Sequence, residues 1–242
     1  MVESTDYKQL VAKYGFAPAP ESVSRLTQIV ARQDCDVDEI AQVINKDPGL
    51  RARLLSVANP RATCVADYTV DTVEDALMRN GLGCALLLAM GTPLGLALTK
   101  TFQTMLSLKL EQVDLRQAIS LQGEHMLGTI GFAGKAVGRV YLRMSLEAAH
   151  EISSKIMGVT LAELTDADEI RDAAGELLNI MTGNFKSNLC DAGLTCRLEP
   201  PVVKRTSDFD TPLLPGCGLE RMAFRAGKLQ LFVTVMVNPF GD

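Results

Sequence analysis

The stretch from Asp172 to Asn179 carries the polar side chains whose types and spacing best suit chemistry. At about 100° per residue, Asp172, Glu176, Asn179 and Gly183 fall within about a 60° arc of a helical wheel. The apolar residues of the same stretch fall on the opposite side: Ile170, Ala173, Ala174, Leu177, Leu178, Ile180, Met181 and Phe185. Two carboxylates and a carboxamide, which both accepts and donates hydrogen bonds, therefore project from one helix face. An ordinary solvated helix face has the same pattern, so the wheel alone leaves both interpretations open.

The composition places this face on a globular protein. The chain has 242 residues, 47% of them hydrophobic, and a formal net charge of −5, which suffices for one large domain or two small ones. Lysine and arginine are scattered, tryptophan is absent and aromatic residues are few. Nucleic acid binding needs clustered positive charge and favours stacking side chains, so we expect no nucleic acid partner.

Cysteine and histidine spacing gives no support for a metal site. The six cysteines form no CxxC pair, and His125 and His150 have no neighbouring acidic motif of the kind that HD-type hydrolases use. The N-terminus is polar and shows no signal peptide, so we expect reduced thiols and a cytoplasmic location. Neither GxxxxGK[ST] nor GxGxxG occurs, so a glycine loop for nucleotides has no support.

One uncharged run, 81–99, is nearly long enough to span a membrane. It contains Gly91 and Pro93, which would interrupt a single helix in mid-run. We therefore expect two short buried helical segments and no membrane partner.

The first half reads as helices with short connections. Helices are expected over about 1–15, after the break at 16–20, from Asp36 to before Pro48, from Pro48 to Ala58 with Asp47 as its N-cap, and from Thr72 onward, with a loop at 59–70. The apolar face of the second of these helices consists of Val23, Leu26, Ile29 and Val30. A linking helix is expected over about 100–120. The fold class predicted for this half is an all-α helical bundle.

These helices carry the motifs of a known family. The motifs are Phe16-x-Pro18-x-Pro20, Asp38-Glu39-Ile40-Ala41-x-x-Ile44-x-x-Asp47-Pro48-x-Leu50-x-x-Arg53-Leu54-Leu55-x-x-Ala58-Asn59 and Thr72-Val73-Glu74-x-Ala76-x-x-x-x-Gly81. Together they closely resemble the start of an HDOD domain over about 10–95. That family's domains run roughly twice this length, so the resemblance covers only their N-terminal helices. It implies a regulatory or protein-binding module without the metal ligands of its HD-hydrolase relatives, and no catalysis in this half.

In the second half of the chain the spacing of apolar residues changes from helical to alternating, which predicts an α+β fold. Alternating residues predict a hairpin over 126–144 with its turn at 133–136, and a second hairpin over 219–237. Between them we expect a helix from Leu146 to Met157 capped by Ser145, a long helix over about 167–190, short strands at 194–198 and 202–203, and a loop at 205–216. The predicted architecture is antiparallel hairpins with two long helices.

This half resembles the CheX/CheC/FliY chemotaxis phosphatases over about 115–240. The hairpin Gly134-x-x-x-Gly138-x-Val140-Tyr141-Leu142-x-Met144-Ser145 looks like the family's first hairpin. The helix motif of the family is Asp or Ser, three residues, Glu, two residues, Asn, then twenty-one residues and Pro. Asp172, Glu176, Asn179 and Pro201 satisfy every interval.

The resemblance implies an enzyme, a hydrolase of two-component signalling and chemotaxis. The implied reaction removes phosphate from the aspartyl-phosphate of a CheY-type response-regulator receiver domain. Asn179 would position the attacking water and Glu176 would dock the receiver's lysine, with Asp172 and Gly183 as partner-binding residues and Pro201 as a structural motif residue. No cofactor is expected on this chain, and Mg²⁺ is expected on the receiver.

The domain boundaries that follow are 1–100 for the partial HDOD-like helical domain, 101–114 for the linking helix and 115–242 for the CheX-like phosphatase domain. This chain has one copy of the motif, as CheX-type members do, and those work as dimers, so a homodimer is expected. The alternative function is a non-catalytic signalling adaptor whose helix face binds a receiver domain or another two-component partner without hydrolysis.

Overall fold

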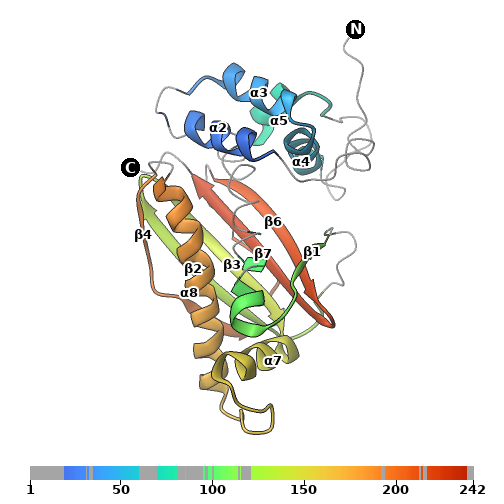
Figure 1. The fold of residues 1–242 in the computed structure, drawn as a ribbon, viewed down its shortest axis with the longest axis vertical. Coiled ribbons are helices and arrows are strands. Elements are labelled where there is room, and N and C mark those ends of the chain that lie inside the picture. The colour runs from blue at the N-terminus through green and yellow to red at the C-terminus, as the bar shows by residue number, and fades with distance from the viewer. Residues whose placement is uncertain are drawn as a thin grey trace.

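The structure is a computed structural model. It describes residues 19–30, 32, 35–59, 70–80, 85, 95, 98–99, 101–113, 115, 121–191, 194–212, 214 and 217–238. Figure 1 shows a group of short helices at one end of a β-sheet and a long helix lying along that sheet. The sheet and its helices hold the candidate site, and the helical group contacts the sheet directly.

Four helices form the described N-terminal part: α2 (Pro20–Val30), α3 (Val37–Lys46), α4 (Pro48–Ala58) and α5 (Val73–Asn80). The predicted start signals act as expected. Asp36 caps α3, and Asp47 accepts hydrogen bonds from the amides of Gly49 and Leu50 at the start of α4. Because Pro48 lacks an amide hydrogen and has a fixed φ, it suits the first position of a helix.

Every element that the structure assigns between residues 19 and 106 is helical. This agrees with the HDOD-like prediction, although the all-α bundle as a whole stays a prediction. The expected helix over 1–15 lies outside the described residues. So do nearly all of the loop at 59–70 and the break near Gly91 and Pro93. In the described part of the chain, no helix combines the length and the apolar character needed to cross a bilayer.

Asp47 does more than cap α4. Its Oδ1 accepts from Gly49 and Leu50, while its Oδ2 accepts from the amide of Ala19 just before α2, at 2.8 Å. The side chain is buried. One carboxylate therefore joins the beginnings of two helices.

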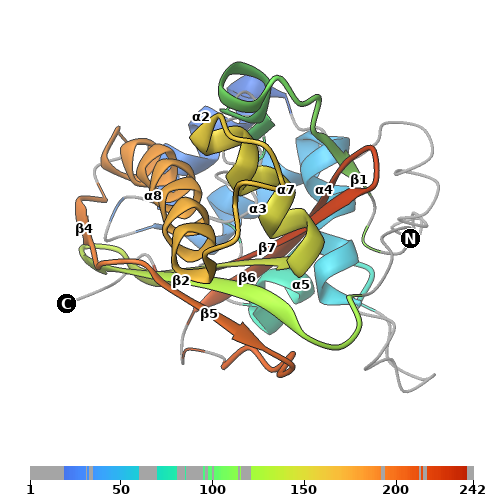
Figure 2. The ribbon, with the colours of Figure 1, turned by 90° about the horizontal axis from the view of Figure 1, so that it is seen from below.

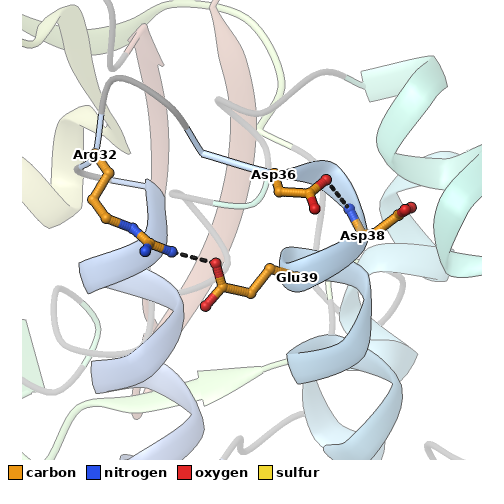
Figure 3. Close-up of polar contacts among 4 residues, drawn as sticks. All are labelled: Arg32, Asp36, Asp38 and Glu39. Atoms are coloured by element: carbon orange, nitrogen blue, oxygen red, sulfur yellow. Dashed lines mark hydrogen bonds and ion pairs between the residues drawn. The ribbon is translucent and has the colours of Figure 1, made fainter.

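We expect Asp47→Ala to lower the free energy of unfolding by about 2–3 kcal/mol, because a cap and a second buried amide both lose their acceptor. Asp36→Ala is the matched control, since Asp36 is exposed and, among the described residues, its side chain accepts a hydrogen bond only from the amide of Asp38 (Figure 3). Its loss is expected to cost about 1 kcal/mol. Urea titration of both variants measures the difference, and equal losses would contradict the bridging role of Asp47.

The predicted linking helix over 100–120 is wrong over residues 107–113. Residues 101–106 are helical, but Ser107 has a positive φ of 52°, which an α-helix does not accommodate. The chain then forms strand β1 (Glu111–Val113), which pairs antiparallel with β6. Tertiary pairing with the sheet therefore outweighs the helical spacing of apolar residues that suggested a continuous helix.

In the described residues the sheet has seven strands: β1, β2 (His125–Gly134), β3 (Val137–Ser145), β4 (Cys196–Leu198), β5 (Val202–Thr206), β6 (Gly218–Ala226) and β7 (Leu229–Asn238). Their order is β1-β6-β7-β3-β2-β4, with β5 also paired to β2, and all pairs are antiparallel. Both predicted hairpins are confirmed. The loop expected from residue 205 begins later, because Arg205 and Thr206 pair with β2.

Two helices cover one face of this sheet: α7 (Leu146–Met157) and α8 (Ala167–Asp191). Both views show them on the same side (Figures 1 and 2). Ser145 caps α7, and Gly158 ends it in the left-handed conformation with φ 69°. With 25 residues α8 is long, whereas α7 has 12, so the prediction of two long helices holds for α8 alone.

The α+β fold predicted for this half is confirmed, and strand alternation builds two apolar clusters on it. Buried side chains of the inner face belong to one cluster that runs on without a break into the N-terminal helices. The outer face carries a small cluster of Leu127, Tyr141 and Met236, covered by Leu214, Cys217 and Leu219. The helical part and the sheet therefore share one core.

A buried ion pair joins these two parts. Arg53 of α4 donates to the carboxylate of Glu220, the third residue of β6, and both side chains are 9% exposed. The two residues are 167 positions apart in the chain. Figure 1 shows the helical group at the end of the sheet where β6 begins.

Candidate functional site

The long helix α8 positions the candidate site. Asp166 accepts a hydrogen bond from the amide of Asp168, which begins the helix, and acidic residues occupy its first turn. Its inner side buries Ala174, Leu178 and Phe185 against the sheet. The opposite side is left to solvent, as the helical wheel predicts.

Asp172, Glu176 and Asn179 lie together on this solvent side. The first two are exposed and Asn179 is half-buried. Asn179 is one turn from Glu176, about 4.5 Å along the axis, and Asp172 lies about 6 Å on the other side of Glu176. Within the described part of the chain, none of the three side chains has a hydrogen bond or ion pair. These three residues, with Gly183, form what we call the α8 ridge.

An open cleft of about 340 Å³ runs along one flank of the ridge. Seven residues line it: Arg171, Asp172, Gly175, Glu176, Asn179, Pro201 and Val203. Pro201 precedes β5 and forms the far wall, so the structure brings Pro201 to the three polar residues of the same motif. A β-carbon built on Gly175 would lie 3.8 Å from Pro201 Cγ and 3.7 Å from Val203 Cγ2, which is ordinary contact.

Arg171 is a cleft residue that the motif spacing did not select. It lines the cleft beside Asp172 and forms an exposed ion pair with Asp168, three residues earlier. Exposed pairs of this kind contribute little to stability, so the guanidinium of Arg171 can exchange Asp168 for another anion at a low cost in free energy. The only signal in the sequence was its position next to Asp172.

The other flank of the ridge is closed by the helical segment 101–106. Thr101, Met105 and Leu106 meet Ile156 of α7 and Glu176, Leu177 and Ile180 of α8 around a gap of about 10 Å³. Figure 1 shows this segment in green beside α8. Glu176 thus stands between the polar cleft and an apolar wall.

Gly183 faces open space, since a β-carbon built there meets nothing within 4 Å. We expect Gly183→Ala to stabilise the protein by about 0.5–1 kcal/mol, because alanine is the better helix former. If a partner approaches α8 closely at this point, the same variant raises the KM for that partner. Thermal unfolding and a steady-state assay on one preparation check both parts, and a stabilised variant with unchanged KM would contradict the partner-binding role.

The described thiols and imidazoles form no nucleophilic or metal-binding group with the ridge. Cys190, Cys196 and Cys217 are free thiols, and burial raises the pKa of Cys196 and of Cys217, which disfavours the reactive thiolate. His125 is buried and stacks on Phe209, and His150 contacts the carbonyl of Leu164. Among the described residues, no group of His, Cys, Asp and Glu could hold a metal ion.

The fold over 62% of this chain is that of solved chemotaxis proteins of the CheX type. The crystal structure of chemotaxis protein CheX from Vibrio vulnificus is similar with a TM-score of 0.53 and 22% identity, covering 62% of this chain and 96% of that one. A CheX from Desulfovibrio desulfuricans gives a TM-score of 0.52 and 16% identity, with 62% and 99% covered. The CheX–CheY–BeF₃–Mg²⁺ complex from Borrelia burgdorferi gives 0.50 and 19%, with 62% and 97% covered.

Two family models match different parts of the chain. Residues 126–214 match the family described as chemotaxis phosphatase CheX, and residues 16–118 match the HDOD domain. Both resemblances predicted from the sequence are thereby confirmed. No curated protein matches the chain. The HDOD match includes residues 101–106 and β1, so it covers the first strand of the sheet.

Proposed function

We propose that this protein dephosphorylates the aspartyl-phosphate of a CheY-type receiver domain, and that the α8 ridge is the surface where this occurs. One observation carries the proposal: Asp172, Glu176 and Asn179 stand on the solvent side of α8 at the motif spacing, with no polar partner in the described chain. Residues 126–214 match the CheX family, which supports phosphatase activity. The CheX–CheY complex among the similar folds supports a receiver as the partner.

Asn179 positions the attacking water in this proposal. Its side-chain carbonyl accepts from the water while its NH₂ donates, so a water held there has a fixed orientation. The water oxygen bonds to phosphorus as the bond between phosphorus and the receiver's aspartate oxygen breaks. An acyl phosphate is already activated, so placing the water in line is the part left to this chain.

Glu176 and Asp172 orient the receiver. The carboxylate of Glu176 pairs with the receiver's lysine and fixes the register of the complex, and Asp172 adds a contact one turn away. Pro201 shapes the cleft wall opposite them. This chain needs no cofactor in the proposal, and the Mg²⁺ bound by the receiver supplies charge neutralisation at the phosphoryl group. The homodimer and the cytoplasmic location stay predictions.

The test is loss of phosphate from receiver domains of the same organism, each phosphorylated with a small-molecule phosphodonor in Mg²⁺. The proposal expects the full-length protein to accelerate loss from at least one receiver beyond its spontaneous rate. Binding of the same receivers, activated with beryllofluoride, is measured in parallel. Receivers that bind without any acceleration would favour the adaptor, and a protein that neither binds nor accelerates would overturn both.

A further inference from the structure

We infer that Met105, from the helical segment 101–106, is part of the surface that docks the receiver and helps to select it. This inference rests on the proposed function, since it concerns the same ridge. It adds a residue outside the CheX match at 126–214 and inside the HDOD match at 16–118.

The position of Met105 is the first argument. Met105 lines the same small gap as Glu176, so the two side chains lie on adjacent walls. The gap is about 10 Å³, which is hardly room for one water, so segment 101–106 packs closely on α8. Met105 is nevertheless 49% exposed. Its side chain is therefore held at the rim of the ridge rather than buried beneath it.

The chemistry of this rim is the second argument. Single exposed apolar side chains are common and carry no meaning alone. Here the half-buried Ile156 and Ile180 extend the apolar surface from Met105 along the flank of Glu176. Methionine is flexible and polarisable, which suits contact with a partner whose surface must fit closely.

The two flanks of the ridge define what the partner must offer. A receiver seated with its lysine on Glu176 meets the polar cleft with Arg171 and Asp172 on one side. On the other side it meets Met105, Ile156 and Ile180. A matching receiver surface therefore has an apolar patch on one side of its lysine and polar groups on the other side. Segment 101–106, which lies within the HDOD match, thus contributes directly to the choice of the receiver.

The test compares Met105→Glu with Met78→Glu. Met78 is 81% exposed on α5 and lines neither the cleft nor the gap, so it is a matched control for adding a charge to an exposed methionine. The probe is the receiver most strongly dephosphorylated by the wild type. We expect Met105→Glu to raise KM about fivefold or more with kcat within about twofold, and Met78→Glu to change neither. Met105→Leu is expected to retain most of the affinity.

Failure of this inference differs from failure of the proposed function. If the wild type is active and Met105→Glu matches the control, Met105 lies outside the docking surface. If the wild type lacks activity, binding of beryllofluoride-activated receivers decides instead. If Met105→Glu binds the receiver more weakly and Met78→Glu does not, the inference holds for a protein that acts as an adaptor. Equal binding by Met105→Glu and Met78→Glu would overturn it.

Discussion

Asn179→Ala is expected to lower kcat for receiver dephosphorylation by about 100-fold while the receiver still binds. A misplaced nucleophile of this kind costs on the order of 100-fold, because the barrier rises when the water loses its in-line orientation. Asn179 is half-buried with no polar partner among the described residues, so its removal leaves none of their polar groups unsatisfied. Steady-state kinetics with the phosphorylated receiver measure kcat and KM separately.

Asn184→Ala is the matched control for this prediction. Asn184 is an exposed asparagine on the same helix, and it lines neither the cleft nor the gap beside Glu176. Its replacement should leave both constants unchanged. An Asn179→Ala variant with wild-type kcat would show that the water is placed by another group. If Asn179→Ala keeps the wild-type kcat but raises KM, Asn179 acts in docking the receiver.

Local signals in the sequence were enough to predict most of the second half. Ser145 marks the start of α7 through its hydroxyl, and Gly158 marks the end through its backbone conformation. Both signals are local and depend on few residues that are distant in the chain. The amphipathic pattern of α8 likewise separates the ridge from the core. Helical spacing alone therefore suffices to place the polar residues of the motif on one solvent-facing side.

Contacts between distant segments could not be predicted in this way. The strand at Glu111–Val113 exists because β6 supplies its hydrogen-bond partners more than a hundred residues later. Met105 lies beside Glu176 because segment 101–106 packs on α8. The same holds for Arg53 and Glu220, whose separation is 167 residues. Hydrophobic periodicity describes one element at a time, so it does not encode these pairings.

Removing one member of the Arg53–Glu220 pair is the second large effect that we expect. Both side chains are 9% exposed, and Glu220 Oε2 has no partner in the described structure. Glu220→Ala would leave a buried guanidinium without this carboxylate, which typically costs about 3–5 kcal/mol. Urea denaturation followed by circular dichroism measures the loss. Because the core is continuous, we expect one transition for both parts of the chain.

The exposed pair between Arg32 and Glu39 is the matched control, with side chains 50% and 36% exposed (Figure 3). Glu39→Ala there should cost less than about 1 kcal/mol, because solvent already screens the two charges. The double variant Arg53→Met with Glu220→Leu should recover most of the stability, since it removes both buried charges of the pair. If Glu220→Ala costs no more than Glu39→Ala, or gives two separate transitions, this pair does not anchor the helical part to the sheet. The position of Met105 then depends on the packing of segment 101–106 against α8 alone.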